Sequence, residues 1–371
     1  METENITDDI LAEKLLNIKN LNKLYIKTND KKIRELISEL FAYFSSTYDM
    51  IYKQWKENYK PLIRKLLKLK KFDEFKFLYN NFNVKQYDNY IVHYAVKYNF
   101  TAVVKFLIEN GYTDYNKIFN YAVKYDNLEV TEYVYQFDKT YIDQIGINAV
   151  KYNITNIAVW AIKHGADPGK MAELAVVNNN IQMLQEIGNL TYYDTYKLAR
   201  TAIEVNNIDA FKILMKRGIE HYSNLAEYAA VYGRLTILEL IPQDQYNTPT
   251  VVATAAEYGH LNIIEWFYKN GYKNVTNIAL SAAKNGHDNV IKWATKRGFN
   301  DFYKLAIIGA KNGYIKIVEY AYENGADNVE EILNSAALND HPDIVSWAIA
   351  HGAKDIENVK YIARVYGYND L

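Results

Sequence analysis

The sequence predicts an all-α fold, an α-solenoid in which short helix–turn–helix repeats stack side by side behind an N-terminal helical cap. Two observations predict it. A short pattern returns every 26 or 27 residues over most of the chain. Glycine and proline are also scarce, with 16 and 5 copies among 371 residues, and a chain with few turn-forming residues favours helices.

The first helix of each repeat is marked by its end. Segments 95–99, 122–126 and 149–153 each read Ala-Val-Lys-Tyr followed by Asn or Asp. We take the alanine as the anchor and number other positions from it, so that +4 is the residue four places later. Every +4 residue is Gly, Asn or Asp, the types that tolerate the left-handed conformation in which many helices end. The anchors are Ala95, Ala122, Ala149, Ala175, Ala202, Ala229, Ala255, Ala282, Gly309, Ala336 and Ala363.

Apolar residues at +8, +11 and +12 predict the second helix, because this spacing forms a stripe along one helix face. Glycine at +16 in seven repeats is expected to end that helix. Neither short helix can bury its apolar face alone, so neighbouring repeats must stack. Four of the five tryptophans share position +11, and we expect them in the core between second helices: Trp160, Trp266, Trp293 and Trp347.

Several segments resemble the ankyrin repeat. They include Gly259-His260 with Ile263-Ile264 and Gly271, Ala282-Ala283 through Gly286-His287, and Gly-Ala-Asp at 165–167 and 325–327. The resemblance covers residues 65–371 and implies a right-handed solenoid of about 11 to 12 repeats without the β-hairpin finger, since ankyrin repeats have about 33 residues. Short repeats of this kind are similar to those of large DNA virus proteins, which implies a viral protein of the host cytoplasm or virus factory.

The N-terminal region, residues 1–64, is expected to form the cap. A weaker repeat can be fitted around Leu67, with its turn at Lys71. The segment from Ile6 to Leu24 resembles the first half of an F-box, which would imply a substrate adaptor of a cullin–RING ubiquitin ligase. The usual Leu-Pro opening is Ile6-Thr7 here, and a plain cap needs the same apolar spacing, so both interpretations stay open.

Composition argues against several functions. The absence of cysteine excludes disulfides, thiolate nucleophiles and cysteine-ligated metals. A net charge of −1, from 43 basic and 44 acidic residues, gives no overall attraction to nucleic acid or acidic membranes. The chain has neither a membrane-spanning apolar run nor a secretory signal pattern. We therefore expect a cytoplasmic protein that binds neither nucleic acid nor a membrane.

Catalytic chemistry is not expected either. His260, His287 and His341 recur at +5, a fixed phase that indicates a structural role in the turn. No phosphate-binding glycine loop, nucleophile elbow or pair of carboxylates accompanies them. We expect no catalytic residue, no metal and no cofactor, and therefore a non-enzymatic protein.

The candidate binding residues lie at +2 and +3, before the turn. In the ankyrin family these positions help to line the concave groove, so the resemblance implies an interaction scaffold whose protein partner has an acidic patch. Alternatively, the tyrosines only pack along the ridge, or the last repeat stacks on another chain in a self-assembling component; the oligomeric state stays open. The residues are Lys97, Tyr98, Lys124, Tyr125, Lys151, Tyr152, Tyr232, Glu257, Tyr258, Lys284 and Lys311.

Overall fold

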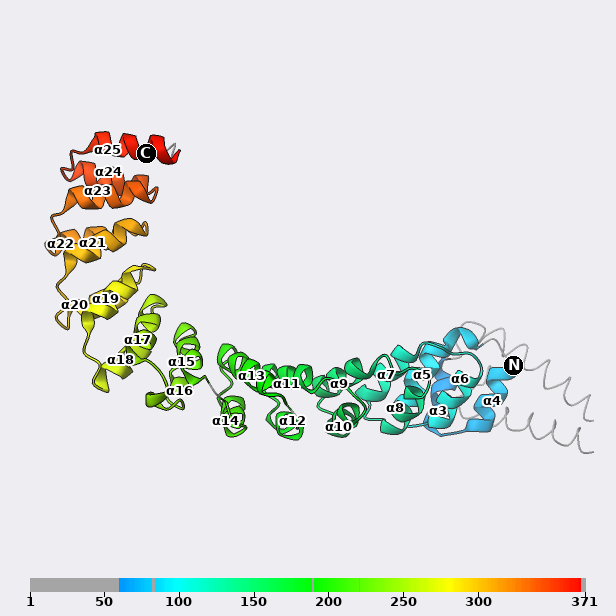
Figure 1. The fold of residues 1–371 in the computed structure, drawn as a ribbon. Coiled ribbons are helices and arrows are strands. Elements are labelled where there is room, and N and C mark those ends of the chain that lie inside the picture. The colour runs from blue at the N-terminus through cyan, green and yellow to red at the C-terminus, as the bar shows by residue number, and fades with distance from the viewer. Residues whose placement is uncertain (1–59, 82–83, 189, 220, 368–371) are drawn as a thin grey trace, which may run out of the picture. The chain divides into compact units, whose positions relative to one another are not determined.

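The computed structural model describes residues 60–81, 84–188, 190–219 and 221–367. This part of the chain is all-helical, with 23 α-helices, two short 3-10 helices and no strand (Figure 1). The all-α prediction is therefore confirmed for these residues. The expected cap and the F-box-like segment fall almost entirely on residues 1–59, outside the described residues.

The helices alternate between a first and a second helix of each pair, with η1 (Lys85–Tyr87) and η2 (Gln243–Gln245) between pairs. The first helices are α3 (Lys60–Lys68), α5 (Asp88–Lys97), α7 (Tyr115–Lys124), α9 (Ile142–Lys151), α11 (Pro168–Val177), α13 (Tyr192–Glu204), α15 (Tyr222–Val231), α17 (Thr248–Glu257), α19 (Val275–Ala283), α21 (Phe302–Lys311), α23 (Val329–Leu338) and α25 (Ile356–Tyr366). The second helices are α4 (Phe72–Asn81), α6 (Thr101–Glu109), α8 (Leu128–Tyr135), α10 (Thr155–Lys163), α12 (Ile181–Glu186), α14 (Ile208–Lys216), α16 (Leu235–Leu238), α18 (Leu261–Lys269), α20 (Asp288–Thr295), α22 (Ile315–Glu323) and α24 (Pro342–Ala350).

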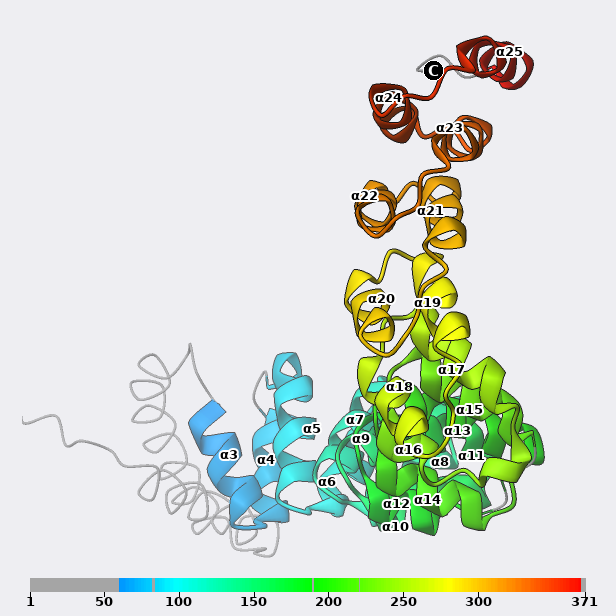
Figure 2. The same cartoon turned by 90° about the vertical axis from the view of Figure 1, so that its left-hand side faces the viewer.

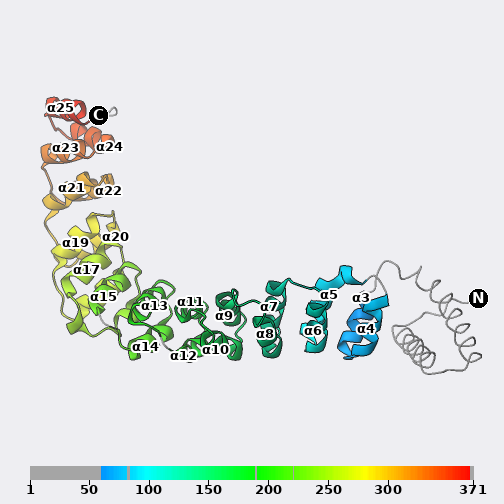
Figure 3. The ribbon, with the colours of Figure 1, turned by 45° about the vertical axis from the view of Figure 1, so that its right-hand side comes forward.

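The chain divides into two compact units. Unit 1 holds residues 1–175 and 186–188, and unit 2 holds residues 176–185 and 189–371. In unit 1 the first helices α3, α5, α7 and α9 pack one against the next in a row, and each packs on its own second helix (Figure 3). In unit 2 the first helices from α13 to α25 also pack in a row, and those from α13 to α23 each pack on their own second helix, as the separate columns of α19, α21, α23 and α20, α22, α24 show in Figure 2.

The turn after each first helix has one recurring backbone geometry. All eleven +4 residues have positive φ, from 53° at Asn99 to 80° at Gly286. In α5, the N–H of Phe100 donates to the carbonyl of Ala95 at 2.8 Å, and the N–H of Asn99 donates to Val96 at 3.0 Å. These two bonds define a Schellman motif, which satisfies helix-terminal carbonyls. The predicted end of the first helix is confirmed, and so are the positive φ angles of the seven +16 glycines.

The core follows the repeat closely. From α3 to α23, first helices bury the residues at −4, −3, 0 and +1, as Ile91, Val92, Ala95 and Val96 do in α5. From α6 to α24, second helices bury +8 and +9, and +12 where they are long enough. Position +11 lies at the edge of this core: Trp160 and Trp293 are 9% and 7% exposed, whereas Trp266 and Trp347 are half-buried. Trp160, Trp293 and Trp347 pack edge to face on a tyrosine of the preceding second helix, with ring centres 5.1–5.3 Å apart.

The weak first repeat needs a correction. The positive φ lies at Lys70, not Lys71, and the N–H of Lys71 donates to the carbonyl of Leu66 at 2.9 Å. The anchor is therefore Leu66, one residue before the fitted Leu67. Lysine at the turn hid this register, because it is not a residue type that marks a left-handed position. Helix α3 also runs across residues 64 and 65, where we placed the boundary between cap and repeats.

None of the helices in the described part of the chain is long and apolar enough to cross a membrane.

Candidate functional site

The predicted binding residues stand at the ends of the first helices. In most repeats +2 is the last helical residue and +3 is the C-cap, as for Lys97 and Tyr98. Unit 1 holds the members from Lys97 to Tyr152, and unit 2 holds those from Tyr232 to Lys311. Exposed members are Lys97, Lys124, Lys151, Tyr152, Tyr232, Tyr258, Lys284 and Lys311, and half-buried members are Tyr98, Tyr125 and Glu257.

Helical spacing adds two positions that the sequence analysis missed. Residues four apart lie on the same helix face, so −1 lies beside +3 and −2 beside +2. In α5 the rings of Tyr94 and Tyr98 are 5.7 Å apart, and His93 precedes Lys97 by one turn. Applying the 3.6-residue period backward from the lysine and tyrosine would have found both positions.

The residue at −2 lies on the tyrosine at −1 of the next repeat. The guanidinium of Arg64, in α3, is 5.2 Å from the ring centre of Tyr94 in α5, and its Nε donates to the Tyr98 hydroxyl at 3.1 Å. The imidazole of His93, in α5, stacks on Tyr121 of α7 at 4.7 Å. These contacts link three consecutive repeats of unit 1.

The lysines at +2 lie over the same rings. Lys97 Nζ is 5.8 Å from the centres of both Tyr94 and Tyr125, and Lys124 Nζ is 5.9 Å from Tyr125. Two ammonium groups therefore share one aromatic ring, an arrangement favoured by the ring quadrupole. Lys151 Nζ lies 6.0 Å from Tyr152 in the same way. We call this set of residues the cation–tyrosine surface: Arg64, His93, Tyr94, Lys97, Tyr98, Tyr121, Lys124, Tyr125, Lys151 and Tyr152.

The charge of this surface is not neutralised within the described part of the chain. There, Arg64, Lys97, Lys124 and Lys151 form no ion pair. Helices α3 and α7 contain no acidic residue, and the only one in α5, Asp88, accepts a hydrogen bond from Tyr79 at 3.2 Å.

His93 responds to this environment. Burial lowers the pKa of His93, and the charges of Lys97 and Lys124 lower it further. Its Nε2 lies 2.7 Å from the Tyr125 hydroxyl, and its ring stacks on Tyr125 at 5.6 Å. A neutral imidazole is therefore favoured near neutral pH, held between two helices by ring contacts and one hydrogen bond.

The arrangement limits the ligand chemistry. The faces of Tyr94, Tyr121 and Tyr125 are already in contact with cations or with His93. Nucleic-acid bases bind such surfaces by stacking on free aromatic faces, and these contacts reduce the ring area left for stacking. What remains for a ligand is a row of N–H and O–H donors carrying positive charge, which suits carboxylates or other anions.

Unit 2 builds the same framework with acidic residues in it. The guanidinium of Arg200 lies 4.4 Å from the ring centre of Tyr228, just as Arg64 lies on Tyr94, but the Tyr228 hydroxyl donates to Glu204 at +2. Further along, Lys284 Nζ lies 2.5 Å from Glu257 Oε1. Both are +2 residues of neighbouring repeats. Side chains at +2 thus reach one another across the row, and in unit 2 they form an ion pair.

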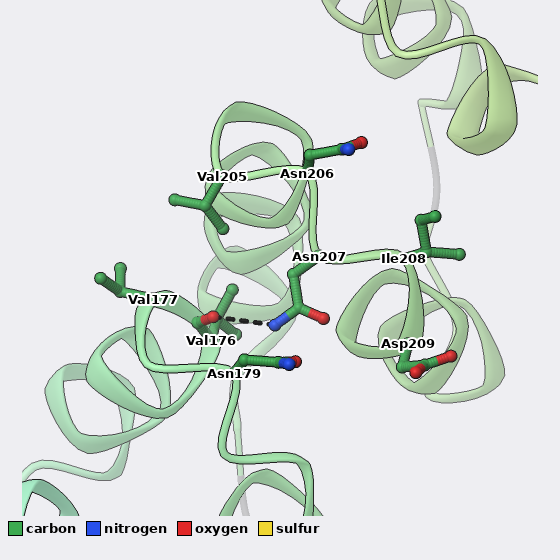
Figure 4. Close-up of a pocket in the computed structure, with 8 residues that line it drawn as sticks. All are labelled: Val176, Val177, Asn179, Val205, Asn206, Asn207, Ile208 and Asp209. Carbon is green, nitrogen blue, oxygen red and sulfur yellow. Dashed lines mark hydrogen bonds between the residues drawn. The ribbon is translucent and has the colours of Figure 1, made fainter.

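Next to the short helix α12, valines occupy +2 and +3 positions that hold lysine and tyrosine in unit 1. Val177 at +2 and Val205 at +3 are 50% and 43% exposed. They line a pocket of about 300 Å³ at the ends of α11 and α13, where Asn207 donates to the carbonyl of Val176 at 2.9 Å (Figure 4). Asp209 lies at the same pocket.

The histidines at +5 pack on the turn of the preceding repeat. A Cβ at Gly233 would lie 2.6 Å from Nδ1 of His260, and a Cβ at Gly259 would lie 2.6 Å from Nδ1 of His287. His260 Nε2 is also 2.7 Å from the carbonyl oxygen of Val231. These contacts fit the structural role inferred from the sequence. No group of three or more His, Asp or Glu side chains suited to hold a metal occurs among the described residues.

Comparison with known proteins adds no family: no protein-family model matches the sequence, and no curated protein matches it significantly.

Proposed function

We propose that the protein is a non-enzymatic interaction scaffold, a right-handed solenoid of ankyrin-like repeats that binds an acidic segment of a protein partner on the cation–tyrosine surface. The solenoid part is supported by first helices that pack in a row and end in the same turn. The resemblance to short-repeat viral proteins extends the proposal to a role in the host cytoplasm or virus factory.

One observation carries the binding proposal: unit 1 sets lysine beside lysine at the positions where the Glu257–Lys284 pair of unit 2 sets glutamate beside lysine. The Glu257–Lys284 pair shows that +2 side chains of adjacent repeats approach each other. At the equivalent place in unit 1 stand Lys97 and Lys124, both within 6 Å of the Tyr125 ring centre. Neighbouring like charges repel, and an anion placed between them would remove that repulsion. A partner's carboxylate is the anion we propose, because the contacts with cations and with His93 leave less ring area on which bases could stack.

The test uses two charge reversals and a matched control. A fluorescein-labelled peptide rich in glutamate is titrated with the full chain, and fluorescence anisotropy reports binding. We expect Lys97→Glu with Lys124→Glu to weaken binding at least about tenfold, equal to about 1.4 kcal/mol, and most strongly at low salt. The matched control is Lys296→Glu with Lys304→Glu, both exposed in unit 2 and outside the candidate binding residues, which changes the net charge equally.

The control pair is expected to change the affinity less than about twofold, since it lies outside the cation–tyrosine surface and solvent screens exposed charges. Equal loss in both double variants would show that only net charge matters. Tighter binding of a labelled oligothymidine than of the acidic peptide would contradict the proposal and indicate a nucleic acid, not a protein, as the partner.

A further inference from the structure

The lysines at +2 form a regular series once the first anchor is placed at Leu66. That register puts Lys68 at +2 of α3, in line with Lys97, Lys124 and Lys151 at the ends of α5, α7 and α9. All four are exposed, and within the described residues none forms an ion pair. The four first helices that carry them pack one against the next. Unit 1 therefore presents one unpaired cation per repeat along a single row.

Helix packing sets the period of this series. Packed helices lie about 8–10 Å apart, so the backbone positions that carry the lysines recur at about that interval. A bound segment with the same period would need acidic side chains on one face, spaced by about 9 Å.

Among the regular chain conformations, polyproline II matches this period most closely. It rises about 3.1 Å per residue with three residues per turn, so every third side chain shares a face at intervals of about 9.3 Å. In a β-strand, side chains on one face recur at about 6.6 or 13 Å. In an α-helix, every seventh residue recurs at about 10.5 Å, but the helix satisfies its own backbone groups internally.

The tyrosine hydroxyls favour the extended segment over the helix. Tyr98 Oη accepts from Arg64 Nε, which leaves its own O–H proton available to donate. Tyr152, at the same position two repeats later, is 41% exposed. A polyproline II segment has no internal hydrogen bonds and offers its carbonyls to such donors, whereas a helix offers none along its length.

From this match we infer that the partner segment binds unit 1 in an extended, polyproline II-like conformation, with a Glu or Asp at every third residue over about ten residues. This inference rests on the proposed function and adds the register and conformation of the partner to it.

Three peptides with four glutamates each test the register. One contains four Glu-Pro-Pro triplets, and the second contains the same four glutamates and eight prolines with the glutamates at every second position. A third, longer peptide is helical, with four glutamates at every seventh position. Isothermal titration calorimetry on the full chain is expected to give the triplet peptide an affinity about tenfold higher than either other, because only its glutamates all meet a lysine.

A double-mutant cycle locates the contact. Replacing the two inner glutamates of the triplet peptide by glutamine is expected to lower the affinity about tenfold for the natural chain. For the Lys97→Gln, Lys124→Gln variant, the same replacement should have an effect of less than about twofold, because the partners are already removed. Both inner pairs are changed together, so the result does not depend on the direction of the peptide.

The outcomes separate this inference from the proposed function. Equal affinity for all three peptides would overturn the register but keep binding of acidic segments. Preference for the every-seventh peptide would replace the extended segment by a helix. Absence of binding by every acidic peptide at low salt would overturn the proposed function and this inference together.

Discussion

The turns of unit 1 and those of the later repeats of unit 2 reach one backbone conformation with different side chains. In unit 1, Asn99 and Asp126 hold φ of 53° and 55°, and their side chains accept hydrogen bonds from Asn127 and Asn156 of the next repeat at 3.0 and 2.8 Å. In unit 2, glycines from Gly233 to Gly313 take this place, each covered by a His or Tyr ring of the next repeat. The choice of turn residue is therefore coupled to a residue of the next repeat, 27 to 30 positions later.

This coupling explains why glycine stands at these turns of unit 2. A positive φ does not by itself require glycine, because Asn and Asp adopt positive φ in unit 1 at moderate cost. The aromatic ring does demand it, since a Cβ at Gly259 would lie 2.6 Å from Nδ1 of His287. Unit 1 joins its turns by hydrogen bonds between side chains, and these repeats of unit 2 join theirs by ring packing.

The largest expected effect comes from breaking the glycine turns. Gly259→Ala should destabilise the surrounding repeats by roughly 2–4 kcal/mol, because it adds backbone strain of about 1–2 kcal/mol to overpacking against the His287 ring. Native-state hydrogen exchange of α17 and α19 measures it, since repeat proteins open locally.

Two further variants separate strain from steric conflict. Gly298→Ala has φ of 101° but nothing within 4 Å of the added Cβ, so only the backbone strain should appear. Combining Gly259→Ala with His287→Ala should recover the steric part. If the double variant is as unstable as the sum of the singles, the ring does not explain the glycine.

The second prediction concerns the hydrogen-bonded turns. Asn127 is 5% exposed; its Oδ1 accepts from the N–H of Val130 at 3.0 Å and its Nδ2 donates to Asn99 Oδ1 at 3.0 Å. Asn127→Ala removes a helix cap and a bond between repeats, and we expect a loss of about 1–2 kcal/mol. Hydrogen exchange of α7 and α8 is the measurement.

A matched variant separates the contribution of the helix cap from that of the bond between repeats. Asn127→Asp keeps the acceptor for Val130 and removes the donor to Asn99, so it should lose less than the alanine variant. Equal losses from the two variants would mean that the cap contributes nothing and that the bond between repeats accounts for the whole effect.

Local rules made the turns and most of the core predictable, whereas contacts between repeats were not. The +4 residue can be recognised because it is always Gly, Asn or Asp, and the spacing of apolar residues indicates both helices. Lys70 carries no such signal, so the first register was placed one residue late. The pairing of Glu257 with Lys284 depends on which helices become neighbours. The division into two units was also hidden, because the 26- or 27-residue rhythm continues through it.

The candidate site was predictable in part for the same reason. Periodicity singled out Lys97, Tyr98, Lys124 and Tyr125, because they repeat at a fixed phase. It did not single out Arg64, since the N-terminal repeat was out of register. Nor could it distinguish the unpaired lysines of unit 1 from Lys284, because charge balance is decided between repeats.

The smallest expected effect is the pH dependence of the stability of unit 1. In unit 2 the −2 residue that lies on the tyrosine of the next repeat is Arg200, on Tyr228, rather than a histidine. The pKa of His93 is lowered in the folded chain by burial and by Lys97 and Lys124, and the other titratable side chains in contact with its ring are Tyr94, Tyr121 and Tyr125. Protonation therefore favours the unfolded state. The stabilisation is fully present above the ordinary histidine pKa of about 6.5 and is lost as pH falls through the lower folded value.

We expect α5 and α7 to lose more protection from hydrogen exchange between pH 7.5 and 5 in the natural chain than in His93→Gln, which stays neutral. Asp88, whose pKa is raised by burial, acts in the opposite direction in both chains and cancels in the difference. An NMR titration of the His93 ring giving a pKa above 6.5 would contradict the prediction and reverse its sign.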